Sequence, residues 1–574
     1  MYDMIFDREK YGDSSSAEEM IGRSSGGFSA VTESRKGPDI IINDDPYDLD
    51  PDNKSVRTQS IMSKASSQQQ LKRSLKSRHL AMISLGGVIG QGLFLSSGAN
   101  LNQAGPGGAL IAYGLIGILV FWVAYSLGEM STYIPVSGSF TIFCRRFVDN
   151  SFGTMIGYNY WATWSVVVAS ELAAVPIIMN YWPNELPDWA WSGISLAIIL
   201  IINMLGARSY GETEYWFSLI KILAVIIFII VGCFVSGGLI GGEVYGFKYW
   251  SDPGAFPNGV QGIFDSLILA SFSMQGTEIV GITAGEAGNP RKDVPRAIKN
   301  VFWRIVIFYI GSIFVMGMVI PYTDPSLLKN EDSTSPTSST EVPHLTTVSP
   351  FTIVFSKGNL DSVAHIMNAI ILITVISCAN SGLYVASRTL LALAQGYISK
   401  RGVPVYALIC TSLVSLITFS TFFIPGRALF TVLTKLPGVA VLITWCGICI
   451  AHFRFRRAFK LQNRDFKDLP MTAPWHPLGD ILDVIVCPLI AVFTGYKYFN
   501  PPSAVGMIGQ YLGLFLCVIG FVLLKIFTKS KVIPLKDIDL DTGRSDISFE
   551  PQEIPKLTGP WYIRSWKRIV IAFT

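Results

Sequence analysis

Three ionisable side chains lie inside long apolar runs of the sequence. Glu171 is followed by Leu-Ala-Ala-Val, Lys221 by Ile-Leu-Ala-Val, and Glu278 by Ile-Val-Gly-Ile. A charge at the centre of a membrane helix costs about 2.5–3.5 kcal/mol on insertion scales, so such a residue is normally retained for function. Two acids and one amine that can exchange protons, without a nucleotide-binding loop or a redox centre, indicate proton-coupled transport. The alternatives are a hydrogen-bonded structural Glu278 and a Lys221 that reaches toward the membrane surface.

Glycines interrupt the apolar pattern at two places. Residues 86–92 read Gly-Gly-Val-Ile-Gly-Gln-Gly, and residues 272–278 read Phe-Ser-Met-Gln-Gly-Thr-Glu, with Gly281 and Gly285 following. Glycine is a poor helix former, so both segments favour a locally unwound backbone. Transporters use such interrupted helices to point half-helix N-termini at an anionic substrate group near the bilayer midplane. The alternative for residues 86–92 is a small-residue face for helix packing.

The elements that position these residues follow from hydropathy. Hydrophobic residues make up 50% of the 574 residues and charged residues only 15%, against about 25% charged in an average soluble protein. A membrane helix needs about 20 apolar residues, and backbone groups cannot stay unpaired in lipid, so we predict an all-α membrane protein. Twelve spans are predicted, at roughly 79–99, 108–130, 154–181, 188–206, 213–236, 261–284, 300–321, 362–394, 403–424, 428–452, 478–497 and 504–527. The breaks fall in spans one and six, which are matching positions of a five-plus-five inverted repeat followed by two extra helices.

The distribution of lysine and arginine predicts the orientation and the domain limits. Alternate intervals between spans are basic, as at Arg145 and Arg146, whereas residues 99–108 carry no cation. The positive-inside rule therefore places both termini in the cytosol. We expect residues 1–77 to form a disordered cytosolic tail, residues 78–528 the twelve-helix domain, and residues 529–574 a cytosolic C-terminal tail.

Several stretches resemble the fungal amino acid permeases, a branch of the amino acid–polyamine–organocation superfamily, over about residues 71–545. The resemblance is carried by the glycine segment at 86–92 and by a set of short motifs that are specific only in combination. These motifs are Ala104-Gly105-Pro106-Gly107-Gly108, Gly128-Glu129-Met130, Ile134-Pro135-Val136-Ser137-Gly138, Gly211-Glu212-Thr213-Glu214-Tyr215, Gln275-Gly276-Thr277-Glu278 and Asn289-Pro290-Arg291-Lys292-Asp293.

The resemblance implies a midplane amino acid site between helices one, three, six, eight and ten. Backbone amides of the first helix would bind the substrate carboxylate, and the sixth helix would take the ammonium group, with Phe272 as an aromatic gate. Lys221 on helix five and Glu278 on helix six correspond to positions tied to proton coupling. The implied substrate-binding residues are Gly90, Gln91, Gly92, Thr163, Glu171, Phe272, Ser273, Gln275, Gly276, Thr277, Ser377, Asn380 and Ser381.

Substrate choice is less sharply indicated. Residues 281–287 resemble the permeases for basic amino acids, and an acid at Glu171 would pair with a lysine or arginine side chain. The chain also departs from the family pattern at three places, of which the one on helix ten, at Lys435, stands against basic specificity. Gln91 replaces a small hydroxyl residue, Lys435 lies before Gly438 where an Asn or Ser is usual, and the segment 395–402 is about ten residues short. A neutral or broad amino acid range stays an alternative.

Other classes of function have weaker support. A nutrient sensor built on the same fold would bind amino acids without moving them, and a channel would show rings of charge or carbonyls along a pore. An enzyme is not expected, because the five histidines are scattered without a nucleophile–base pair. No cofactor or metal is expected, since the Cys446–Cys449 pair has no second ligand pair. The expected partners are the amino acid, the plasma membrane bilayer and ubiquitylation machinery acting on tail lysines such as Lys10; nucleic acid is not expected.

Overall fold

The computed structural model describes residues 82, 86, 89–136, 138–183, 185–285, 287, 289–327, 348–394, 404–422, 426–499 and 502–544. Regular structure in these segments is helical, and the bridges that join two described residues are Gly237 with Val244 and Phe499 with Pro502. The predicted tail at 1–77, the short segment 395–402 and the residues beyond 544 lie outside the described residues. The domain limits therefore stay a prediction.

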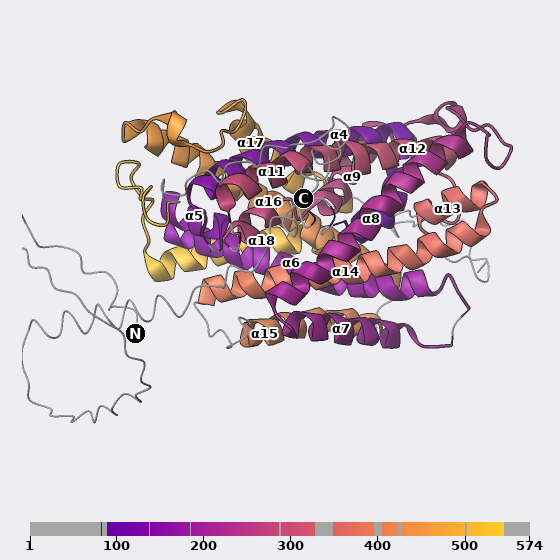
Figure 1. The fold of residues 1–574 in the computed structure, drawn as a ribbon, viewed down its shortest axis with the longest axis horizontal. Coiled ribbons are helices and arrows are strands. Elements are labelled where there is room, and N and C mark those ends of the chain that lie inside the picture. Colours follow the sequence, from indigo (N-terminus) through magenta and orange to yellow (C-terminus); the bar gives the residue numbers. More distant parts are fainter. Residues whose placement is uncertain are drawn as a thin grey trace, which may run out of the picture. The chain divides into compact units, whose positions relative to one another are not determined.

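In the part of the chain that the structure describes, helix follows helix along the sequence (Figure 1). In chain order they are α3 (Gln91–Phe94), α4 (Ser96–Tyr133), α5 (Phe140–Phe147), α6 (Asn150–Met179), α7 (Asp188–Met204), α8 (Ala207–Ser236), α9 (Gly259–Met274), α10 (Ile279–Ala284), α11 (Pro290–Trp303), α12 (Gly311–Val319), α13 (Pro350–Lys357), α14 (Asp361–Ala394), α15 (Val405–Ser415), α16 (Gly426–Leu461), α17 (Leu478–Phe493) and α18 (Ala504–Thr528). A π-helical stretch, Arg304–Ile310, joins α11 to α12.

Many of these helices are long and apolar enough to cross a bilayer. In the described part of the chain, 9 helices meet that criterion, and two shorter apolar helices, Asp188–Met204 and Val405–Ser420, match the predicted spans four and nine. Together they account for spans two to twelve. Span one is described only in part, so the full count of twelve and the inverted repeat stay predictions, whereas the all-helical membrane fold is confirmed.

The long helix α4 contains a sharp bend that separates the end of the first span from the second. Gly105 has φ 72° and ψ 177°, a left-handed region that side-chain-bearing residues rarely adopt, and Pro106 follows it. A Cβ at Gly105 would lie 2.4 Å from Pro257 Cδ, so glycine is also required by space. The bend turns the chain back so that α4 packs along α9.

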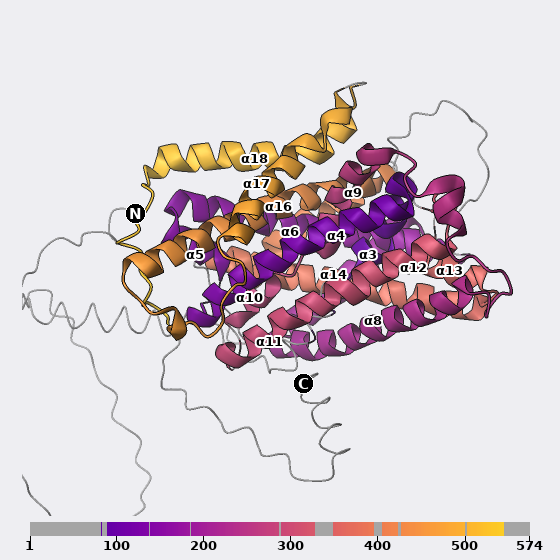
Figure 2. The ribbon, with the colours of Figure 1, turned by 90° about the horizontal axis from the view of Figure 1, so that it is seen from above.

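Helix α6 holds the centre of the helical assembly. It packs against α14 on one side and α16 on the other, and most of its side chains are buried. By contrast, α18 lies at the edge of the assembly (Figure 2). Only 6% of its 18-residue apolar stretch is buried inside the protein. Apolar side chains left exposed along such a helix face lipid in a membrane protein.

The chain beyond α18 packs back onto the helices. Ile533 N–H donates to Val148 O at 3.0 Å. Arg464 bonds the Asp541 carboxylate with both terminal guanidinium nitrogens, at 2.7 and 2.5 Å. Arg146 pairs with Asp539 at 2.7 Å. Residues 529–544 are thus attached to the ends of α5 and α16.

Candidate functional site

The first break places a half-helix N-terminus against an acid. Helix α3 begins at Gln91, preceded by an extended Gly90 with φ −138° and ψ −150°. The Gln91 N–H donates to both carboxylate oxygens of Glu171, each at 3.3 Å. Glu171 comes from the middle of α6 and is 2% exposed. A carboxylate at this position satisfies an otherwise unpaired amide and lies at the positive end of the half-helix.

Space around Gly90 is closed by side chains from two other helices. A Cβ at Gly90 would lie 2.4 Å from Glu171 Oε1 and 2.6 Å from Cys378 Sγ of α14. Both distances are shorter than any real contact of that kind, so any side chain here would push α6 and α14 away. The absence of a side chain at Gly90 therefore lets α3, α6 and α14 approach one another closely at this residue.

The Gln91 side chain, one of the departures from the family pattern, turns toward α6. Its Nε2 donates to Ser170 Oγ at 2.5 Å. Its Oε1 is buried and has no hydrogen-bond partner in the described structure. The added bulk is thus packed beside Ser170, and the amide oxygen stays available to a hydrogen-bond donor.

Gly92 and Ser273 bring the two interrupted helices into contact. A Cβ at Gly92 would lie 2.6 Å from Ser273 Cα, and Ser273 Oγ donates to Gly92 O at 2.7 Å. The Ser273 carbonyl accepts from Tyr309 OH at 2.7 Å, and its hydroxyl is 2.9 Å from Tyr113 OH. Helices α3, α4 and α9 are therefore joined at this residue.

The second break lies between α9 and α10. Helix α9 ends at Met274, and Gly276 takes φ 92°, a conformation that favours glycine. Glu278 accepts the Gly276 N–H with both oxygens, at 3.1 and 3.2 Å. It also accepts from Tyr160 OH at 3.2 Å and Trp445 Nε1 at 3.3 Å. Glu278 thus holds the unwound segment to α6 and α16.

The other residues of the second break differ in how fully they are bonded. Thr277 Oγ1 donates to Met274 O at 2.9 Å and accepts from Arg304 at 2.6 Å. Phe272 is 6% exposed. Gln275 is 4% exposed, yet neither its amide nitrogen nor its amide oxygen has a hydrogen-bond partner in the described structure. Leaving buried polar groups unpaired is costly, so Gln275 marks a position suited to a polar ligand.

Lys221 is paired within the membrane domain. Its Nζ lies 3.3 Å from Glu214 Oε1, and both side chains are fully buried. Ser377 Oγ of α14 donates to both Glu214 oxygens at 2.9 Å. The arrangement links α8 to α14 close to Cys378, which in turn borders the first break.

Three predicted site residues are bonded elsewhere. Thr163 Oγ1 donates to Asn159 O in its own helix at 2.7 Å. Asn380 Oδ1 accepts from Asn203 at 2.8 Å, and Ser381 Oγ accepts from Tyr210 OH at 3.1 Å. Among the described residues, no hydrogen bond joins these three to the breaks.

Sequence reasoning missed three residues that belong to this region. Glu214 was noted only as part of a motif, although the spacing Glu214–Ser218–Lys221 puts all three on one helix face. Arg304 is fully buried and bonds Thr277, and its position inside a predicted apolar span was the available signal. Cys378 gave no signal, because a lone cysteine in an apolar run looks like an ordinary core residue.

Lys435, the second departure, lies away from the breaks. Its Nζ is 2.7 Å from Tyr498 OH, and the small cavity there is also lined by Asp265, Lys497 and Gln510. The presence of Lys435 is therefore weak evidence on which amino acid side chain fits near Glu171. A larger groove of about 600 Å³ between α4, α9 and α17 is lined by apolar and aromatic side chains, among them Leu115, Trp122 and Phe264.

Interrupted helices that meet buried acids, inside an assembly of long apolar spans, define a multi-pass membrane transporter. A sequence model of the family described as amino acid permease matches residues 79–535. The chain therefore belongs to the amino acid permease family, as its motifs indicated.

Relatives of known name support this assignment along most of the chain. The lysine-specific permease LysP of Lactococcus lactis is 43% identical over 83% of this chain and 94% of its own length. The histidine permease HisP of the same species is 40% identical over 82% of this chain and 98% of its own length. The lysine-specific permease of Saccharomyces cerevisiae is 38% identical over 83% of this chain and 79% of its own length.

Proposed function

We propose that this protein imports basic amino acids, lysine and arginine, together with protons across the plasma membrane, with both of its termini in the cytosol. The observation that carries the proposal is the Glu171 carboxylate bonded to the Gln91 amide at the first helix break. It joins the two features that the function needs, a half-helix N-terminus for an anion and a buried acid for a cation.

Substrate binding would exchange one carboxylate for another. The Gln91 amide that Glu171 now occupies is the group that a substrate carboxylate would use. Once an amino acid takes that amide, the Glu171 carboxylate is released beside the substrate. A cationic side chain is its natural partner, because a buried charge is tolerated only when it is paired. Neutral amino acids offer no such partner, so the exchange favours lysine and arginine.

The substrate ammonium group would be held at the second break. The unwound segment leaves backbone carbonyls without helical partners, and Gln275 has a buried amide without a hydrogen bond. Phe272, packed beside Gly438, would cover the bound substrate as a gate. The Ser273 carbonyl oxygen already accepts a hydrogen bond from Tyr309 OH. It could therefore accept the substrate ammonium group only with its second lone pair.

Proton coupling would use the two remaining buried charge systems. Lys221 and Glu214 form an ion pair that a proton can neutralise, and Ser377 connects this pair to α14. Glu278 is tied to the second break through Gly276, so a change in its charge would alter how that segment is held. Protonation at either place would therefore change contacts that join moving helices.

Substrate range is supported by the relatives as well as by Glu171. Two of the named relatives are lysine-specific permeases, which favours a basic substrate. A histidine permease of similar identity makes histidine the second candidate, because its side chain can also pair with Glu171 when protonated.

Uptake in permease-deficient yeast expressing this chain tests the proposal. Radiolabelled lysine, arginine, histidine and a neutral amino acid are compared at pH 5 and pH 7.5, with surface level measured in parallel. We expect acid-stimulated lysine and arginine uptake that is reduced at least about 10-fold in Glu171→Gln, because a hydrogen bond to a charged group contributes about 1.5–3 kcal/mol.

Other results would redirect the proposal. Uptake of only the neutral amino acid would overturn the basic specificity and leave the transport function standing. Saturable binding of lysine without uptake, with the protein at the cell surface, would favour an amino acid sensor. Lysine uptake of equal rate at both pH values would remove the proton from the mechanism.

A further inference from the structure

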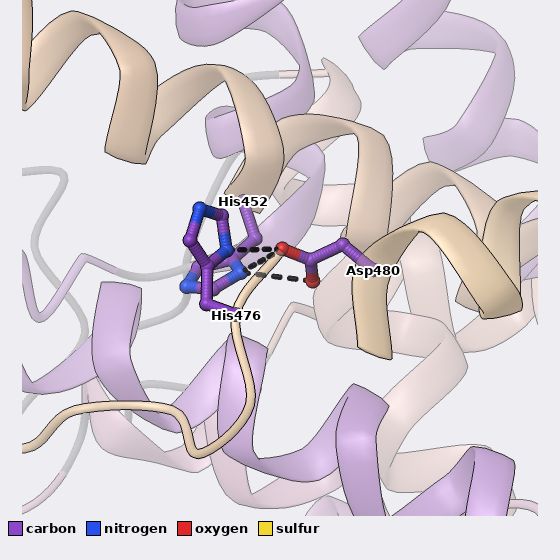
Figure 3. A group of neighbouring side chains, drawn as sticks. All are labelled: His452, His476 and Asp480. Carbon is purple, nitrogen blue, oxygen red and sulfur yellow. Dashed lines mark hydrogen bonds and ion pairs between the residues drawn. The ribbon is translucent and has the colours of Figure 1, made fainter. Parts of the chain in front are cut away.

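A second group of polar side chains lies at the seam between α16 and α17, about two turns along α16 from Trp445, which bonds Glu278 at the second break. His452 Nδ1 lies 2.8 and 2.9 Å from the two carboxylate oxygens of Asp480. His476 Nδ1 lies 2.8 Å from Asp480 Oδ2. One ligand atom from each residue falls within 4.8 Å of the others. Figure 3 shows that one nitrogen of each imidazole ring points toward the Asp480 carboxylate.

Neighbouring residues fix the orientation of these ligands. The second ring nitrogen of His452, Nε2, faces Glu129 Oε2 at 3.4 Å. Glu129 is itself held by Arg456, at 2.5 Å, and by the Ala473 N–H at 2.6 Å. A histidine that binds a metal almost always directs its other ring nitrogen at a carboxylate or carbonyl in this way.

Asp480 is oriented from the opposite side. Ser126 Oγ of α4 donates to Asp480 Oδ1 at 2.9 Å, which leaves Oδ2 as the oxygen that both histidines share. Asp480 and His452 are buried, whereas the His476 side chain is 19% exposed. The group is therefore closed on the side of the helices and accessible on the side of the segment that precedes α17.

The charges around the group favour a cation. Glu129, Asp480 and Asp483 are buried acids within this seam, and Arg456 is the arginine that pairs with Glu129. Asp483, one turn along α17 from Asp480, contacts Cys449 Sγ at 3.4 Å. The acids outnumber this permanent cation, so a divalent ion would bring the seam close to neutrality, which buried charges require.

We propose that His452, His476 and Asp480 bind a divalent cation of the zinc class. Imidazole nitrogen with one carboxylate oxygen suits Zn²⁺ and its neighbours Co²⁺, Ni²⁺ and Cu²⁺ rather than Mg²⁺ or Ca²⁺, which prefer oxygen alone. Zinc bonds to nitrogen and oxygen are about 2.0–2.2 Å long, so tetrahedral ligands stand about 3.4 Å apart. Each histidine nitrogen lies 2.8 Å from Asp480 Oδ2, so each of these two separations would widen by about 0.6 Å to admit the ion. A fourth ligand would come from solvent on the His476 side, where that side chain is 19% exposed. The proposal departs from the sequence-based expectation that the chain has no metal site.

Such an ion would fasten three helices to one another. His452 belongs to α16, Asp480 to α17, and Ser126 and Glu129 attach the group to α4. His476 adds the segment that joins α16 to α17. The ion touches none of the residues at the helix breaks, so it acts on the stability of this end of the assembly and is independent of the proposed transport.

Metal binding to the purified full-length protein tests the proposal. The protein is stripped with a chelator, dialysed against Zn²⁺ and analysed for bound metal per chain by mass spectrometry. His476→Gln and Asp480→Asn remove ligands, and His365→Gln, which removes a described histidine outside the group, is the matched control. We expect one zinc per chain in the native protein and in His365→Gln, with affinity reduced on the order of 100-fold or more in the other two.

A spectroscopic reading separates a lost ligand from a lost fold. Co²⁺ bound to this group would give visible d–d absorption that changes in His476→Gln, a variant at a partly exposed position that keeps the buried contacts. Native protein that binds no more zinc or cobalt than His476→Gln would overturn the proposal. That result would assign the group to a hydrogen-bonded network in which protons balance the acids.

Discussion

At the residue scale, the site depends on glycines that leave room for other helices. A Cβ at Gly92 would meet the Ser273 backbone at 2.6 Å, whereas a Cβ at Gly114, in α4, would meet nothing within 4 Å. We expect Gly92→Ala to abolish lysine uptake at normal surface level, because backbone atoms cannot yield as a flexible side chain can. Gly114→Ala is the matched control and should transport normally. Equal uptake by both variants would show that the contact between α3 and α9 is not needed for transport.

The ion pair between Lys221 and Glu214 has a structural role and a proposed role in proton coupling, and the two roles can be tested separately. Removing one partner of a buried ion pair leaves an unpaired charge and costs about 3–5 kcal/mol, whereas neutralising both partners is far better tolerated. We expect Lys221→Met to lower thermal stability strongly and the double variant Lys221→Met with Glu214→Gln to regain most of it. Both should lack acid-stimulated uptake. Stable, fully coupled transport in the double variant would remove this pair from the proton pathway.

Single functional residues could be predicted from the sequence where a charged residue lies within an apolar run. Glu171, Lys221 and Glu278 stood out because each is a charge inside an apolar run, and the structure buries all three. Their partners could not be predicted. That Glu171 would bond the Gln91 amide depends on where α6 passes α3, and no spacing within one helix encodes such a crossing.

At the element scale, the second break requires a backbone shape as well as space. Gly276 has φ 92°, and alanine in such a conformation costs roughly 1–2 kcal/mol. Gly242 has a similar φ of 76° in a loop, with nothing near its Cβ position. We expect Gly276→Ala to lose most lysine uptake and Gly242→Ala to keep it, as measured by initial rates normalised to surface protein. The comparison separates general backbone strain from damage to the break, and equal losses would contradict a special role for residues 275–278.

Helices were predictable as elements, and their interruptions were partly so. Apolar length and glycine content located spans two to twelve and both breaks to within a few residues. The boundary between spans one and two was predicted between residues 99 and 108, and the non-helical backbone at Gly105 lies there. Gly105 and Pro106 allow a bend tight enough that helical hydrogen bonding resumes at once on either side.

At the scale of the whole molecule, residues 529–544 are attached by ion pairs at the ends of helices. The Arg464 guanidinium lowers the pKa of Asp541, so this contact is complete above the ordinary carboxyl range and is lost as pH falls through the lowered value. We expect Arg464→Ala to speed hydrogen exchange of residues 533–542 near neutral pH. After correction for the intrinsic exchange rate at each pH, protection of these amides in the native protein should fall to the level of the variant only in acid. Because exposed pairs contribute about 0.2–1 kcal/mol each, transport itself should change little.

Function at this scale could be inferred from the sequence more fully than the site. Family motifs and apolar spans sufficed for an amino acid permease, and the comparisons confirm that assignment. The group of His452, His476 and Asp480 was not foreseen, because its first and last members are 28 residues apart in the sequence. They come together only where α17 packs on α16. Lysines proposed for ubiquitylation, such as Lys10, lie outside the described residues and stay a prediction.

The central claim is that lysine moves together with protons through a site controlled by Glu171. Its most direct test is lysine accumulation in liposomes that contain only the purified protein, with an imposed pH gradient as the single driving force. We predict accumulation against the lysine gradient when the outside is acidic, its collapse on addition of a proton ionophore, and its absence in Glu171→Gln. Accumulation that ignores the pH gradient, or that persists unchanged in Glu171→Gln, would contradict the account.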